Sequence, residues 1–139
     1  MTDFVLIAHL AATWFMVGLS TTIQWVHYPL FPRHGSQWGS FHASHTRRML
    51  LVLLVPWSIE GVTALALPFL LTGTDRWLAA GGLVLVGSIA AITVLGAVPM
   101  HRKLASGWDA AIHAQLMGVD RTRWVLWLLR GIVAVALLV

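Results

Sequence analysis

Apolar residues fill four long stretches of this 139-residue chain, and short segments between them hold most of its polar residues. The stretches cover residues 4 to about 26, 49–71, 77–100 and 124–139. At about 1.5 Å of rise per residue, the first three are long enough to cross roughly 30 Å of hydrocarbon as α-helices. The fourth is shorter. We expect it to begin near Arg121, with Trp124 and Trp127 as interfacial anchors.

The pattern predicts an all-α protein, a four-transmembrane-helix bundle with antiparallel neighbours. We expect one integral membrane domain over residues 1–139, with helices over about 4–28, 41–71, 77–100 and 121–139. The composition agrees, because 58% hydrophobic and 10% charged residues leave too little polar surface for a water-soluble domain. The first stretch carries Asp3 and no small-residue cleavage site, so we interpret it as a retained helix.

The basic residues indicate how the helices are oriented. Seven of the nine Lys and Arg lie in two of the connections: Arg33, Arg47, Arg48, Arg102, Lys103, Arg121 and Arg123. The positive-inside rule then predicts that both connections are cytoplasmic and that both termini lie on the extracytoplasmic side of a bacterial inner (cytoplasmic) membrane. Because membrane orientation explains the basic charge, we expect membrane lipids as partners and no nucleic acid. A glycine-rich third helix also makes a homo-oligomer possible.

Polar side chains inside the apolar stretches recur at matching depths. His9 and His27 are 18 residues apart on the first helix, which is five whole turns, and His42 and Glu60 are 18 apart on the second. Antiparallel packing should therefore form two polar layers, an inner one with Gln24, His27, His42 and His45 and an outer one with His9 and Glu60. The third helix ends at "VPMHRKL", which adds His101 to the inner layer.

The fourth helix brings an arginine into the apolar interior. Arg130 lies seven residues after Arg123, on nearly the same face. An unpaired charge is costly inside a membrane, so we expect Arg130 to pair with Glu60 or to bind a ligand. Pro56 should kink the second helix beside Glu60 and open a cavity there. Two other prolines, Pro29 and Pro99, should end the first and third helices.

The histidines of "FHASH" suggest a metal site. Imidazole is the commonest protein metal ligand, and two histidines three residues apart on a helix can hold one ion or two adjacent ions. We expect metal ligands at His27, His42, His45 and His101. The chain has no cysteine, so an imidazole-rich site for a transition metal, such as iron or copper, or a haem held by two histidines, is predicted.

Simpler interpretations of the same residues stay open. His42 and His45 lie near Arg47 and Arg48 and could meet anionic head groups, and His9 could be a hydrogen-bonding contact between helices. We expect two further histidines, His34 and His113, to be solvated surface residues. The glycines of "GGLVLVG" should allow close helix approach: Gly81, Gly82 and Gly87.

Several motifs carry a resemblance to known proteins. With His9 in the first helix, "QWVHYPLF", "FHASHTRR", "VPMHRKL" and "RTRWVLWLLR", nearly the whole chain resembles a family of small uncharacterised bacterial four-helix integral membrane proteins. The Arg and Trp pattern of Arg121, Arg123 and Trp124 is distantly similar to the anthrone-oxygenase-like membrane proteins. The first helix is also similar to that of membrane protoporphyrinogen oxidases, and this resemblance implies a haem ligand at His9.

We expect an integral membrane oxidoreductase or oxygenase that acts on a lipophilic small-molecule substrate and uses a metal or haem at the inner layer. Catalytic roles are predicted for Glu60, His9 and Arg130, and cofactor-binding roles for Gln24, Arg123 and Trp124. A proton- or ion-conducting module with a His, Glu and Arg relay is the first alternative. The second is an accessory structural membrane subunit.

Overall fold

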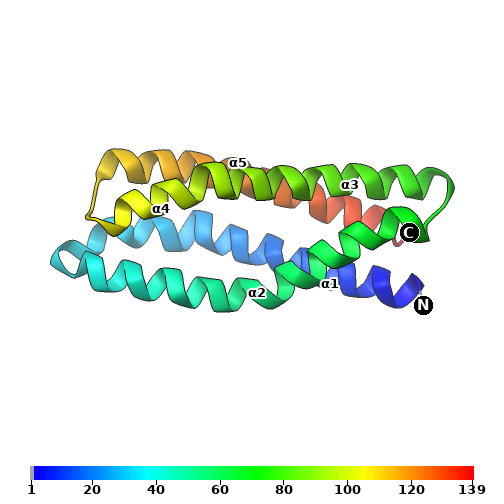
Figure 1. Ribbon diagram of the computed structural model, residues 1–139, viewed down its shortest axis with the longest axis horizontal. Helices are drawn as coiled ribbons and strands as arrows, with labels where there is room; N and C mark the ends of the chain where they lie inside the picture. Colours follow the sequence, from blue (N-terminus) through cyan, green and yellow to red (C-terminus); the bar gives the residue numbers. More distant parts are fainter. Residues whose placement is uncertain (1) are drawn as a thin grey trace.

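The computed structural model describes residues 2–139, and its elements are all helical, as the sequence predicts. The first half of the chain contains α1 (Thr2–Thr22), the π-helical turn η1 (Ile23–His27), the 3₁₀ segment η2 (Tyr28–Gln37) and α2 (Trp38–Leu70). The second half contains α3 (Gly73–Ile92), the π-helical turn η3 (Thr93–Ala97), α4 (Val98–Ala105) and α5 (Ala110–Ala136). Figure 1 shows these elements as long rods lying side by side.

The rods form a closed ring of neighbours. Helix α1 packs against α2 and α5, and α3 packs against the same two helices. Thr2, Val139 and the α2–α3 turn lie at one end of the bundle, which we call the terminal end (Figure 1). The α1–α2 and α4–α5 connections lie at the opposite end, which we call the basic end. Segments distant in sequence can therefore meet in the bundle interior at two different depths.

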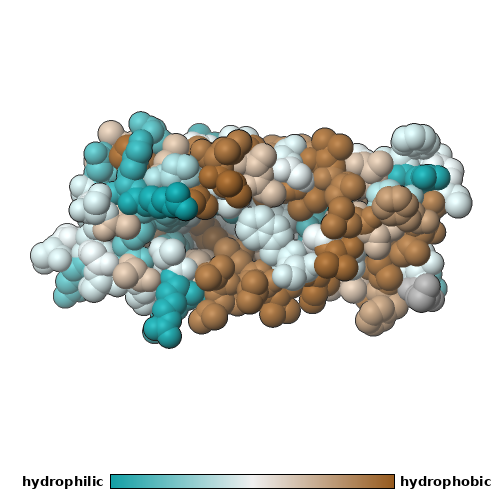
Figure 2. All heavy atoms as spheres, viewed as in Figure 1, coloured by the Kyte–Doolittle hydropathy of each residue, from teal (hydrophilic) through white to brown (hydrophobic). Residues whose placement is uncertain are grey.

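The bundle has charged and polar side chains in its interior and large apolar side chains on its surface. Large apolar side chains such as Phe4, Phe69 and Leu95 are more than three-quarters exposed, at 77%, 82% and 78%. The buried polar and charged residues are His9, Thr13, Ser20, Gln24, His42, His45, Glu60, Asp120, Arg123 and Arg130. Figure 2 shows apolar side chains over most of the surface between the ends and hydrophilic ones gathered at the basic end. Such a surface suits lipid better than water.

Two stretches, Thr2–Leu70 and Gly73–Ala105, are long and apolar enough to cross a membrane. The first is broken at Gly35, where φ of 46° and ψ of −123° are not helical, so that α1 and α2 are separate helices. Helix α5 does not meet that criterion, because Asp120, Arg121, Arg123 and Arg130 interrupt its apolar sequence. Its expected start near Arg121 is also wrong, since α5 begins at Ala110. The carboxylate of Asp109 caps the helix by accepting hydrogen bonds from the backbone N–H groups of Ala111 and Ile112, at 2.8 and 3.0 Å. Apolar content alone could not reveal this amphipathic start.

The prediction that Pro29 and Pro99 end their helices is wrong as well. Each proline instead opens the helical segment that follows a π-helical turn, η2 in one case and α4 in the other. A proline lacks the N–H that would bond to the carbonyl four residues earlier, and its ring collides with that carbonyl. The residues four positions earlier, Trp25 and Leu95, are the central residues of the two π turns. The wider turn thus removes the conflict and lets the helix continue.

Helix α2 continues through Pro56 and bends in its middle (Figure 1). A shallow groove of about 270 Å³ lies on its surface beside the proline, lined by Leu50, Leu53, Leu54, Trp57 and Ser58. The expected cavity beside the carboxylate does not coincide with this groove, since Glu60 is fully buried and does not line it. The side chain of Glu60 instead bonds to Arg130 of α5.

Candidate functional site

A buried ion pair joins α2 to α5. The Nε of Arg130 donates to Oε1 of Glu60 at 2.7 Å, and both side chains are at most 1% exposed. The pairing expected from their similar depth is therefore present. Because neither group reaches solvent, each charge depends on the other for its stabilisation.

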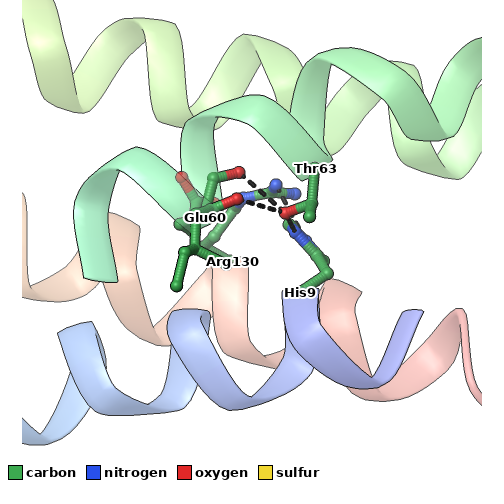
Figure 3. Close-up of polar contacts among 5 residues, drawn as sticks. His9, Glu60, Thr63 and Arg130 are labelled. Atoms are coloured by element: carbon green, nitrogen blue, oxygen red, sulfur yellow. Dashed lines mark hydrogen bonds and ion pairs between the residues drawn. The ribbon is translucent and has the colours of Figure 1, made fainter. Parts of the chain in front are cut away.

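His9 and Thr63 extend this pair into what we call the ion-pair network (His9, Glu60, Thr63 and Arg130; Figure 3). Arg130 Nη2 lies 2.9 Å from His9 Nε2, and His9 Nδ1 lies 2.7 Å from Thr63 Oγ1. A guanidinium only donates, so Nε2 accepts and the neutral imidazole carries its proton on Nδ1 and donates to Thr63. The Thr63 hydroxyl donates in turn to the Ile59 carbonyl at 2.7 Å. One tautomer of His9 therefore satisfies the hydrogen bonds that run from Arg130 through His9 and Thr63 to Ile59.

A glycine on α3 makes room for the arginine. A Cβ atom at Gly82 would overlap Nη1 of Arg130 and would lie 3.1 Å from Cγ1 of Val133. The close helix approach predicted for the glycine-rich segment thus holds at Gly82. The neighbouring glycines at 81 and 87 have no such contact within 4 Å.

Four histidines and a tyrosine meet at the basic end, and we call them the histidine cluster (His27, His42, His45, His101 and Tyr28). His27 Nε2 lies 2.7 Å from His45 Nδ1, and His42 Nε2 lies 3.1 Å from His101 Nδ1. The hydroxyl of Tyr28 lies 2.9 Å from Nε2 of His101. The five residues come from η1, η2, α2 and α4. The structure therefore brings together all four histidines that the sequence marks as metal ligands.

The π turns help to orient two of these residues. His27 is the last residue of η1, and His101 follows η3 by four residues. A π turn adds one residue to a helix and so changes which face the following residues occupy. The positions of His27 and His101 toward α2 consequently depend on Pro29 and Pro99, the prolines that accompany the π turns.

The ring nitrogens of the cluster face one another in pairs. Among residues 2–139, which the structure describes, no three His, Asp or Glu side chains are arranged so that they could hold one metal ion together. The centroids of the His27 and His45 rings are 4.7 Å apart, and those of His42 and His101 are 5.4 Å apart. The two pairs are linked through His45 and His101, whose rings stack at 5.6 Å. The cluster is thus one contiguous imidazole assembly with two hydrogen-bonded pairs.

The three residues predicted to bind a cofactor lie on η1 and α5. Gln24 is buried, and its Oε1 has no hydrogen-bond partner. Arg123 pairs with Asp120 at 3.2 Å, and the indole N–H of Trp124 donates to Thr21 Oγ1 at 3.0 Å. Arg123 and Trp124 therefore have partners of their own within the bundle.

Some polar residues of the interior were not recognised in the sequence. Asp120 precedes the apolar part of α5, is buried, and accepts from the Arg123 guanidinium at 3.2 Å. His113, expected in solvent, is half-buried, and its Nε2–H donates to the carbonyl of Tyr28 at 3.0 Å. Tyr28 is the single tyrosine of the chain, and its place directly after His27 was the available signal.

An apolar layer separates the ion-pair network from the histidine cluster. Its buried residues are Met16, Val17, Ala64, Val86, Ile89 and Trp127. No protein-family model matches the chain, and no curated protein and no solved structure is detectably similar to it. We therefore infer function from the ion-pair network and the histidine cluster.

Proposed function

We propose that the protein is a multi-pass membrane oxidoreductase or oxygenase that binds a transition metal ion, iron or copper, at the histidine cluster. The observation that carries this proposal is the convergence of four imidazoles and one phenol from four separate helical segments. Helix packing alone does not require so many metal-ligating side chains at one place. The ion-pair network offers no comparable ligand set, because its histidine is held by Arg130 and Thr63.

The spacing of the imidazole pairs suits a small ion. Two ligand nitrogens of one tetrahedral ion lie about 3.3 Å apart, because metal–nitrogen bonds measure about 2.0–2.1 Å. The pairs His27–His45 and His42–His101, at 2.7 and 3.1 Å, need to open only slightly to reach that separation. Rotation of the stacked His101 ring toward His45 would supply a third ligand. A haem would have to lie between the two imidazoles of a pair, whose ring nitrogens are in direct hydrogen-bond contact at 2.7 and 3.1 Å, so the cluster fits an ion better than a haem.

The remaining residues of the cluster would serve the bound ion as proton donors and acceptors. A transition metal held by imidazoles supplies a Lewis acid or an electron-transfer centre. The Tyr28 hydroxyl and His101 can exchange a proton along their 2.9 Å contact. We propose a lipophilic substrate because the exterior of the bundle between its ends is apolar (Figure 2), which would give access from the bilayer. Glu60 and His9 lie at a distance from the ion and would hold or supply protons, and Arg130, which stays charged, would position both groups.

Alanine substitution in the cluster tests the proposed ligands. We expect His42→Ala and His45→Ala each to lose bound iron or copper while the protein still inserts and purifies as a folded monodisperse species. His34→Ala is a matched control, because its ring stacks on Phe41 outside the cluster. The readout is metal content by mass spectrometry of protein purified without chelator and without a polyhistidine tag. Unchanged metal content in both cluster variants would rule out these ligands.

The proposed membrane arrangement has four spans, with the basic end in the cytoplasm and both termini outside. Seven basic residues support it, because they lie in the connections at the basic end or in the adjoining parts of α2, α4 and α5. Because the chain has no cysteine, single cysteines can be labelled without background. We expect an impermeant maleimide to label Thr74→Cys in intact spheroplasts, and Ser36→Cys and Ser106→Cys only after permeabilisation. Labelling of Ser106→Cys in intact spheroplasts would contradict this topology.

A further inference from the structure

A band of buried polar side chains runs along the contact between α1 and α5, and we call it the polar seam. Its α1 and η1 members are His9, Thr13, Ser20 and Gln24, which are four, seven and four residues apart. At about 100° per residue this spacing keeps α1 positions 9, 13 and 20 on one face. The α5 members are Asp120, Arg123, Trp127 and Arg130, at spacings of three, four and three residues. All eight are less than 9% exposed.

The two rows face each other. Helices α1 and α5 pack along their length, and Arg130 bonds to His9 at one end of the contact. Trp124, beside the seam on α5, bonds to Thr21 further along α1. Trp127 packs in the same buried cluster as Met16 and Val17, the α1 residues between Thr13 and Ser20. The seam therefore extends from the ion-pair network, through the apolar layer, to the level of η1 and the histidine cluster.

The seam contains an unusual concentration of unsatisfied polar atoms. Its hydroxyl, amide and indole groups with no hydrogen-bond partner are Thr13 Oγ1, Ser20 Oγ, Gln24 Oε1 and Trp127 Nε1. The Asp120–Arg123 pair adds Oδ2 and Nε, and Glu60 Oε2 lies at the far end beside Arg130. Buried polar groups in proteins are nearly always paired, with protein or with ordered water. Since these atoms include both donors and acceptors, water molecules can bridge them, and a packed apolar core cannot.

We propose that the polar seam binds a file of internal water molecules and is a path for protons between the ion-pair network and the histidine cluster. Water bonded in a row between hydroxyl, amide and carboxylate groups can pass protons along it, as intramembrane acid and histidine chains do. Toward the terminal end the ion-pair network is followed by the apolar residues Leu67, Ala79 and Leu137. The path is thus open toward the basic end and closed toward the other, and it gives Glu60 and His9 exchange with one side only. This inference does not depend on the proposed metal.

X-ray radiolytic labelling in ¹⁸O-water tests the path, because bound water generates hydroxyl radicals that oxidise adjacent Met and Trp side chains. Met16 and Trp127 are 2% and 0% exposed, yet we expect both to incorporate solvent oxygen. Trp38 is the matched control: it is 4% exposed, and its indole N–H is satisfied by the Leu104 carbonyl at 2.8 Å. If Met16 and Trp127 are as unreactive as Trp38, the seam is dry and the proposal is wrong.

Near-isosteric substitutions supply a second readout. We expect Thr13→Val and Ser20→Ala to lower the oxidation of Trp127 toward the level of Trp38. The unfolding temperature should stay the same or fall, because hydroxyl groups that bind water are lost. The control Thr22→Val removes an exposed hydroxyl that bonds within its own helix at 3.0 Å and should change neither. In a dry seam, removal of an unpaired hydroxyl would raise the unfolding temperature instead. A higher unfolding temperature together with unchanged oxidation of Trp127 would overturn the proposal of a water-filled seam. This outcome does not depend on how much metal the same preparations contain.

Discussion

Replacing Glu60 with alanine is expected to destabilise the protein by about 3–5 kcal/mol, because it leaves the Arg130 guanidinium buried without a counter-charge. Arg130→Ala should cost a similar amount, since it leaves both the Glu60 carboxylate and the His9 ring without their partner. The double variant Glu60→Leu/Arg130→Met removes both charges and fills similar volume. We expect it to be more stable than either single alanine variant, as is typical for buried ion pairs replaced by apolar residues.

Thermal or denaturant unfolding in detergent, read by far-UV circular dichroism, measures these differences. Arg76→Ala is a suitable control, because Arg76 is exposed at the start of α3 and its loss should change stability by less than about 0.5 kcal/mol. Equal stability of Glu60→Ala, Arg130→Ala and the double variant would show that the pair does not hold the helices together.

The second large effect is expected at Gly82. Gly82→Ala places a methyl group on the guanidinium of Arg130. The guanidinium has little room to move, because it is bonded to Glu60 and His9. We expect a loss of about 1–3 kcal/mol, typical of overpacking in a core. The adjacent Gly81 has nothing within 4 Å of an added Cβ, so Gly81→Ala should be neutral or stabilising by up to about 1 kcal/mol through helix propensity.

The two substitutions can be combined to identify the cause. In the Arg130→Ala background the space beside α3 is empty, so Gly82→Ala should cost much less than it does in the wild-type protein. A penalty of the same size in both backgrounds would place the conflict elsewhere, for example at Val133.

Depth along the apolar stretches predicted much of the candidate site. The positions of Glu60 and Arg130 were enough to suggest their pairing, and the 18-residue spacings placed the inner histidines together. Spacing could not reveal that His9 is fixed between Arg130 and Thr63, because that depends on side-chain directions across three helices. The role of Gly82 was likewise hidden, since a glycine that houses a guanidinium looks in the sequence like any other small residue.

Helix ends were predicted less well, for a physical reason. Prolines usually mark helix boundaries. Before Pro29 and Pro99, however, a π-helical turn removes the clash between the proline ring and the preceding carbonyl and lets the helix continue. The first turns of α5 carry no long apolar run and depend on the Asp109 cap. Local hydrogen bonding determines where the helices end at the two prolines and where α5 begins. A hydropathy pattern contains no information about these hydrogen bonds.

The proposal that the histidine cluster binds a transition metal can be tested on the wild-type protein. The most direct measurement is the metal content and absorption spectrum of the wild-type protein, purified in detergent without chelator and without a polyhistidine tag. We expect iron or copper near one ion per chain, retained through gel filtration and lost in His45→Ala. A folded wild-type protein that contains neither metal, and binds neither when the ions are added back, would contradict it.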